Sequence, residues 1–155
     1  MRICLVRHGE AEASGSDDRR ALTRGGREGV ERVALAAASA GVRVERIRHS
    51  GKRRALETAE IFAARFACPV DPDPIEHLLP GASPQETARW IDSLRESHLL
   101  VSHLPLVERL AALLVSGGQE EPLLPFPPAT LVWLEEAGGL WKTLAHITPQ
   151  TLGRP

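Results

Sequence analysis

The stretch that decides the fold is residues 2–10, which read Arg2-Ile3-Cys4-Leu5-Val6-Arg7-His8-Gly9-Glu10. The apolar run predicts a buried strand, and it ends at a guanidinium and an imidazole, two groups that a core does not accept without partners. The glycine after them lets another group come close to the backbone. This favours His8 as a nucleophile that the rest of the chain surrounds with cations and a second histidine. A solvated Arg7 and a hydrogen-bonded His8 at an ordinary strand end explain these residues equally well.

The composition is that of an ordinary globular chain, and its length suits one domain, which we predict to span residues 1–155. The net charge of -1 provides no basic field for nucleic acid or a membrane surface. No apolar run reaches the roughly 18 residues of a transmembrane helix, and the first residues lack the pattern of a signal peptide. We therefore predict a cytoplasmic location, with neither nucleic acid nor membrane as a partner.

Apolar periodicity predicts strands that alternate with helices. After a polar loop over residues 11–20, we expect helices over 24–40, 52–66, 84–95 and 104–116, strands over 44–50 and 98–102, and a hairpin over 130–147. Thr23 and Ser83 are suited to cap the helices that follow them. This order indicates an α/β three-layer sandwich, with a mainly parallel, mixed central sheet flanked by helices.

Three of the predicted strands end in polar groups. The first ends in Arg7 and His8, the second in Ser50, and the third in Ser102 followed by His103. The carboxyl ends of parallel strands lie at one edge of the sheet, where ligands of such sheets bind. We therefore expect these side chains to converge on one site.

The helix after Ser50 starts with Lys52, Arg53 and Arg54, although its dipole disfavours cations there. A bound anion would offset this charge. We expect the first two side chains to extend into water and Arg54 to face the edge, where it and Arg7 can hold a phosphate with forked donors. Guanidinium charge should also lower the pKa of His8 and keep it neutral. The chain lacks a Walker-type glycine loop and a carboxylate cluster near these ends, so we predict metal-independent chemistry without a cofactor.

Four segments now form a recognisable set: residues 7–10 (RHGE), 22–26 (LTRGG), 50–59 (SGKRRALETA) and 100–107 (LVSHLPLV). Together they resemble the histidine phosphatase superfamily, and more narrowly the small phosphohistidine phosphatases of the SixA type. The resemblance implies a phosphoglycerate-mutase-like fold in which His8 attacks phosphorus and is transiently phosphorylated. It also implies that Arg7, Arg54 and His103 bind the phosphoryl oxygens, with Ser50 as a further phosphate-binding candidate.

The chain departs from the family pattern at two places. Gly51 stands where proline is usual, which should loosen the turn before Arg54. Many members also carry a carboxylate that protonates an alcohol leaving group. Here the matching position holds His77, with Glu76 one residue before it. Both are candidate proton donors, and both are equally well explained as surface groups.

The short connection between residues 66 and 83 leaves no room for a large lid. An open site without a strong acid suits a phosphoramidate, because an imidazole leaves more readily than an alkoxide. We predict a phosphatase that removes phosphate from phosphohistidine on a phosphorelay or phosphotransfer domain, with inorganic phosphate as product. One alternative is a phosphatase of small phosphate esters that uses Glu76 or His77 as the acid. A less favoured alternative is a phosphate-binding module without turnover.

Overall fold

Strand β1 lies at the centre of a five-stranded sheet. In the computed structural model, which describes residues 1–153, the strand order is β2-β3-β1-β4-β5. The strands are β1 (Arg2–Arg7), β2 (Arg46–His49), β3 (His98–Ser102), β4 (Leu131–Ala137) and β5 (Leu140–Ile147). The β1–β3 and β2–β3 pairs are parallel, whereas β4 runs antiparallel to both of its neighbours. The predicted mixed, mainly parallel sheet is confirmed.

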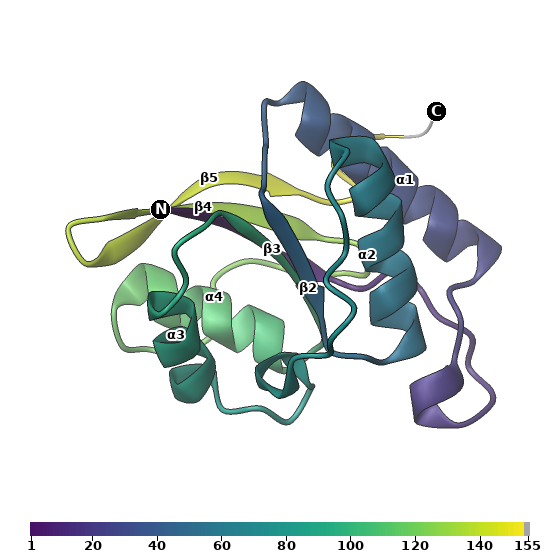
Figure 1. The fold of residues 1–155 in the computed structure, drawn as a ribbon, viewed down its shortest axis with the longest axis horizontal. Helices are drawn as coiled ribbons and strands as arrows, with labels where there is room; N and C mark the ends of the chain where they lie inside the picture. The colour runs from purple at the N-terminus through teal and green to yellow at the C-terminus, as the bar shows by residue number, and fades with distance from the viewer. Residues whose placement is uncertain (154–155) are drawn as a thin grey trace.

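Helices cover both faces of this sheet (Figure 1). One face carries α1 (Arg24–Ser39) and α2 (Arg53–Phe66), and the other carries α3 (Pro84–Asp92) and α4 (Leu106–Ser116). Two short 3-10 helices, η1 (Asp17–Arg19) and η2 (Glu76–Leu78), lie in the loops before α1 and α3.

The alternation of side chains along β1 explains the three layers. Cys4 and Val6 belong to the core that packs against α1 and α2, and Ile3 and Leu5 belong to the core that packs against α3 and α4. Because both faces of β1 are covered, the strand reads as a continuous apolar run. The predicted three-layer α/β sandwich is confirmed.

Both cores share this one sheet, which is consistent with a single domain. The last two residues of the predicted domain, 154 and 155, lie outside the described residues. Within residues 1–153, no helix has the length and apolar character needed to cross a membrane. The cytoplasmic location stays a prediction.

The predicted helix caps are present. Thr23 Oγ1 accepts a hydrogen bond from the Gly26 N–H at 2.9 Å, and Ser83 Oγ accepts one from the Glu86 N–H at 3.3 Å. Several predicted elements are too long. The second helix begins after residue 52, the third ends at residue 92, and β2 covers only 46–49. The third helix ends early because the N–H groups of residues 93 and 94 bond to carbonyls three residues back.

The parallel pairing brings the polar strand ends to one edge. Strands β1 and β3 pair in register up to Arg7 and Ser102, and the His8 N–H then donates to the Ser102 carbonyl at 3.1 Å. His49, the last residue of β2, pairs with Val101 of β3. The loops that leave all three strands therefore start beside one another.

A close contact with α1 fixes the loop after β1. A Cβ atom on Gly26 would lie 2.1 Å from the Glu10 carbonyl oxygen, and one on Gly9 would lie 2.7 Å from Val30 Cγ2. The Thr23 N–H also donates to the Glu10 carbonyl at 3.0 Å. The group that Gly9 allows to come close is therefore α1, which holds the backbone next to His8 in place.

We expect Gly26→Ala to lower the free energy of unfolding by about 2–3 kcal/mol, because its methyl group would overlap the Glu10 carbonyl and force α1 away from the loop. Urea unfolding followed by circular dichroism measures this change. The matched control is Gly25→Ala, whose added Cβ would lie 3.9 Å from the nearest atom. Equal stability of the two variants would contradict the proposed role of this contact.

Candidate active site

A pocket opens at the carboxyl edge of β1 and β3. Its volume is about 590 Å³, and Arg7, His8, Arg54 and His103 line it together. We call this candidate site the catalytic pocket. The structure thus brings together the four residues that the sequence singles out for the catalytic centre. Ser50 is not among the lining residues, but it contacts His103.

The hydrogen bonding of His8 determines which of its nitrogens can act as a nucleophile. Its Nδ1 lies 2.7 Å from the Gly9 carbonyl oxygen. A carbonyl only accepts hydrogen bonds, so Nδ1 carries the proton in this contact. In a neutral imidazole, Nε2 then holds the free electron pair. The imidazole of His8 lies beside that of His103, with ring centroids 4.9 Å apart.

The surroundings of His8 also keep its imidazole neutral. Burial, followed by the charges of Arg54, Arg7 and Arg20, lowers the pKa of His8 to about 4, although the hydrogen bond to the Gly9 carbonyl works in the opposite direction. Guanidinium charge contributes as predicted, but burial is the larger cause. A neutral imidazole with a free Nε2 is the state that can attack phosphorus.

His103 is buried and held by Ser50. Ser50 Oγ lies 2.6 Å from His103 Nε2, and the Lys52 N–H donates to the same hydroxyl at 3.4 Å. Burial lowers the pKa of His103 well below its usual value, and the charges of His8 and Arg54 add to this effect. His103 is therefore a neutral imidazole. When the Ser50 hydroxyl donates to Nε2, the ring proton of His103 is on Nδ1.

Arg7 and Arg54 reach the pocket from β1 and from the start of α2. Arg7 Nη1 donates to the Phe126 carbonyl at 2.8 Å, and Arg54 Nη1 donates to the Asp17 carbonyl at 2.7 Å. A backbone carbonyl thus orients each guanidinium. Burial lowers the pKa of both arginines, which nevertheless remain charged at any physiological pH.

Three of the residues that line this pocket carry buried nitrogen atoms without hydrogen-bond partners. Arg7 Nε, Arg54 Nε and His103 Nδ1 are buried and have no hydrogen-bond partner within residues 1–153. An unsatisfied buried donor costs about 1–3 kcal/mol. Three such atoms on residues of one pocket indicate a site that an acceptor-rich anion would complete.

The loop before α1 supplies contacts that the sequence analysis missed. Asp17 Oδ1 accepts hydrogen bonds from Arg54 Nη2 at 3.2 Å and from Arg20 Nη2 at 3.1 Å, and Asp17 Oδ2 contacts Lys52 Nζ. Asp17 and Arg20 also line the catalytic pocket. The adjacent aspartates of this polar loop were the only available signal, and no periodicity links residue 17 to residue 54.

The prediction that Lys52 extends into water is wrong. Its side chain is 13% exposed and is paired with Asp17 and Asp18, whereas the Arg53 side chain is 56% exposed. The reason is local, because Lys52 is not inside the helix but is its N-cap, with an extended backbone. From this position its ammonium group reaches the two aspartates.

The two candidate proton donors lie outside the catalytic pocket. Glu76 and His77 line an adjoining pocket of about 570 Å³, and of its lining residues only Pro80 is shared with the catalytic pocket. The His77 ring lies near Trp90, with ring centroids 5.9 Å apart. The structure therefore does not bring either residue together with His8 and His103.

The turn before Arg54 is held in place, in contrast to the loosening predicted from Gly51. Gly51 has a φ angle of 93°, which proline cannot adopt. Its N–H donates to His49 Nδ1 at 3.0 Å, and His49 Nε2 in turn lies 3.0 Å from the Asp71 carbonyl oxygen. A glycine with a free N–H is therefore what this form of the turn requires.

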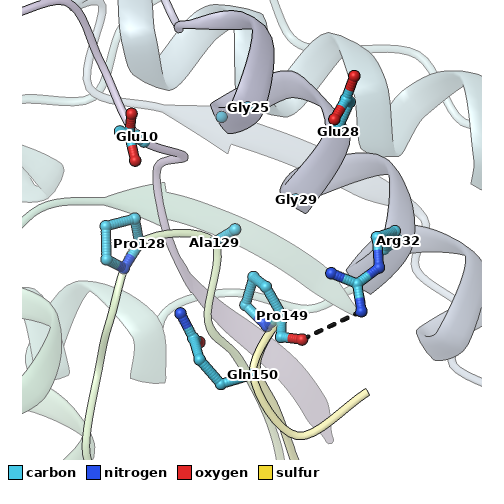
Figure 2. Close-up of a pocket in the computed structure, with 10 residues that line it drawn as sticks. Glu10, Gly25, Glu28, Gly29, Arg32, Pro128, Ala129, Pro149 and Gln150 are labelled. Carbon is cyan, nitrogen blue, oxygen red and sulfur yellow. Dashed lines mark hydrogen bonds between the residues drawn. The ribbon is translucent and has the colours of Figure 1, made fainter. Parts of the chain in front are cut away.

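A smaller pocket, of about 250 Å³, lies beside α1. Its other walls come from the loop after β1, the loop before β4 and the segment after β5 (Figure 2). It shares Glu10 and Pro128 with the catalytic pocket. Its one lining cation, Arg32, donates to the Pro149 carbonyl at 3.2 Å, and Glu10 and Glu28 add carboxylates. This arrangement does not suit a phosphate, so the pocket that holds His8 is the better candidate for a phosphoryl site.

Comparison with known proteins confirms the resemblance suggested by the motifs. The model of the histidine phosphatase superfamily (branch 1) matches residues 3–75, from β1 to the segment after α2. The serine/threonine-protein phosphatase PGAM5, mitochondrial, of Homo sapiens is 35% identical over 95 residues, which cover 52% of this chain and 33% of PGAM5. The chain thus spans about a third of the length of the curated relatives that it matches.

Solved structures share the fold over nearly the whole chain. The protein histidine phosphatase SixA complexed with tungstate has a TM-score of 0.86 at 24% identity, covering 98% of this chain and 99% of SixA. The alpha-ribazole phosphatase from Shigella flexneri has a TM-score of 0.73 at 18% identity, covering 96% of this chain and 97% of that enzyme. The predicted phosphoglycerate-mutase-like fold is confirmed.

The pKa of His8 gives a direct test of this electrostatic description. We expect its Cε1–H resonance to titrate near pH 4, well below the usual value of about 6.5 for histidine. Protonation removes the free electron pair on Nε2. If His8 attacks phosphorus, the single-turnover rate of phosphoryl transfer to His8 should therefore fall as the pH falls through about 4. NMR titration, with the His8→Gln variant used to assign the resonance, measures this. A pKa above about 6 would contradict the description.

Proposed function

We propose that this chain, which shares the fold of SixA and carries the histidine phosphatase match, is a phosphatase that removes phosphate from phosphohistidine on a protein. It acts through a covalent intermediate on His8. The observation that carries the proposal is the neutral His8 imidazole with a free Nε2, in a pocket lined by Arg7, Arg54 and His103, each of which has a buried nitrogen without a partner in the described part of the chain.

In the first step, His8 Nε2 forms a bond to phosphorus as the bond from phosphorus to the substrate imidazole breaks. The leaving nitrogen takes the bonding electron pair. When the other nitrogen of the phosphohistidine ring is protonated, the product is a neutral imidazole, so this step needs no acid from the enzyme. In the second step, water attacks phosphorus on the opposite side from His8, which releases inorganic phosphate and restores His8.

The role of the other groups is to hold the phosphoryl oxygens. Arg7 and Arg54 carry fixed positive charge in a partly buried site, where it stabilises the developing charge of the transition state more than it would in water. His103 adds the Nδ1 proton as a neutral donor, and Ser50 maintains that tautomer through Nε2. Ser50 therefore acts through His103 and does not need to touch the phosphate.

The separation of the two candidate proton donors from the catalytic pocket supports phosphohistidine as the substrate class. Glu76 and His77 line the adjoining pocket, and hydrogen bonds from Lys52 and Arg20 hold the pKa of Asp17 well below its usual range. Asp17 therefore cannot donate a proton near neutral pH. An alkoxide leaving group would need such a donor, whereas an imidazole does not.

A phosphatase of phosphate esters is the second candidate. It is favoured by the likeness to PGAM5, which is named a serine/threonine-protein phosphatase, and to an alpha-ribazole phosphatase. The pocket next to the catalytic one, with Glu76 and His77, would then have to deliver the proton to the leaving alkoxide.

Loss of radiolabel from a phosphohistidine-bearing phosphotransfer domain tests the proposal. The wild-type protein should accelerate this loss, and His8→Ala should lower the rate on the order of 1,000-fold or more, because the residues of such a site act as a unit. The matched control is His77→Gln, which removes an imidazole outside the catalytic pocket and should retain the wild-type rate. Equal rates for wild type and His8→Ala would contradict the proposal.

A panel of alkyl phosphates separates the two candidates. A higher kcat/KM on alkyl phosphates than on the phosphohistidine domain, lost in Glu76→Gln or His77→Gln, would establish the second candidate in place of the first. If no substrate is turned over, and calorimetry shows that inorganic phosphate binds tightly, the chain is a phosphate-binding module.

A further inference from the structure

The carboxylate of Asp17 forms ion pairs with cations at the proposed phosphoryl site, Arg54 among them. It accepts a hydrogen bond from Arg54 Nη2 at 3.2 Å, and it also pairs with Arg20 and Lys52. Within residues 1–153, no other carboxylate lies within 4.0 Å of the Arg54 guanidinium nitrogens. A carboxylate and a phosphoryl group both accept hydrogen bonds from guanidinium N–H groups. A phosphoryl group that binds Arg54 Nη2 therefore has to replace the Asp17 carboxylate there.

The two partners differ in their freedom to move. The Arg54 side chain is 5% exposed, and the Asp17 side chain is 56% exposed. Asp17 belongs to the three-residue helix η1, in the loop between the isolated bridge partners Ala11 and Leu22. The arginine is therefore fixed by its burial, whereas the carboxylate lies at the water boundary and can rotate into solvent.

The backbone and the side chain of Asp17 act separately on Arg54. Arg54 Nη1 donates to the Asp17 backbone carbonyl at 2.7 Å, while only Nη2 contacts the carboxylate. If the side chain rotates away, the carbonyl still orients the guanidinium. The contact therefore combines a backbone hydrogen bond with a separate side-chain ion pair.

We propose that Asp17 is an internal anion that competes with the phosphoryl group for Arg54 and so sets the affinity of the site for phosphate. When the phosphoryl group binds, the carboxylate leaves Arg54 Nη2 for solvent, and the Asp17 carbonyl keeps the guanidinium in position. When inorganic phosphate leaves, the carboxylate returns and neutralises the buried cation. The inference rests on the proposed function, because it requires the phosphoryl group to bind at Arg54.

Two consequences follow from this exchange. The free protein does not hold an uncompensated guanidinium in a buried position, which would be costly. The product phosphate is also released more readily, because its departure is coupled to the return of the carboxylate. Hydrogen bonds from Lys52 and Arg20 lower the pKa of Asp17 and keep its carboxylate charged near neutral pH. The anion that competes for Arg54 is therefore present at that pH.

Phosphate binding by the variant Asp17→Asn tests this inference. The asparagine keeps the backbone carbonyl and the size of the side chain but removes the charge. We expect isothermal titration calorimetry to show inorganic phosphate bound about 3- to 10-fold more tightly than by wild type, which corresponds to a carboxylate that holds Arg54 in roughly 70–90% of molecules. The inhibition constant of vanadate should fall by the same factor.

The matched control is Asp18→Asn. It makes the same change in charge in the same loop, but Asp18 pairs with Lys52 and has no oxygen within 4.0 Å of the Arg54 guanidinium nitrogens. Its phosphate affinity should change less than about 2-fold, as for an exposed surface pair. Thermal unfolding confirms that both variants are folded before binding is measured.

Each outcome decides one of the two claims. Weaker or unchanged phosphate binding by Asp17→Asn, or an equal gain in affinity by Asp18→Asn, would overturn competition at Arg54. The proposed function would still hold in that case if the wild-type protein binds phosphate and removes it from phosphohistidine. If neither wild type nor Asp17→Asn binds phosphate, and neither turns over phosphohistidine, both claims fail.

Discussion

The backbone hydrogen bonds between β1 and β3 place Arg7 beside Ser102 and extend to the His8 N–H. This parallel pairing is the constraint on which the site depends, because the loop after β1 and the loop after β3 then begin beside one another. One loop carries His8, the proposed nucleophile, and the other carries His103, whose ring lies 4.9 Å from that of His8. The contact of Gly9 and Gly26 with their neighbours then prevents the first loop from moving away from the edge.

Burial produces the chemistry of the pocket as much as charge does. It keeps both imidazoles neutral and leaves the nitrogens of two guanidinium groups without full pairing. Such donors are already oriented before a substrate arrives, so little reorganisation is needed during the reaction. The same burial raises the free-energy cost of the positive charge on Arg54 when no anion is bound. Asp17, nine residues after His8 in the loop between β1 and α1, supplies negative charge at Arg54.

The fold and the centre of the site could be predicted from the sequence, because both depend on short-range patterns. The apolar run of β1, the Thr23 and Ser83 caps and the polar strand ends all carry local signals. The contacts of Asp17 and Lys52 could not be predicted, since they join a loop to a helix start 35 or more residues away without any periodicity. The separation of Glu76 and His77 from the pocket likewise depends on where η2 packs, which spacing alone does not determine.

The central claim is that His8 Nε2 attacks a phosphoryl group held by Arg7, Arg54 and His103. A crystal structure with orthovanadate, which imitates the transition state of phosphoryl transfer, tests it most directly. We expect a bond from vanadium to His8 Nε2, with the equatorial oxygens within hydrogen-bond distance of the two guanidinium groups and of His103 Nδ1. Vanadate bound in another pocket, or bonded to any residue other than His8, would contradict it.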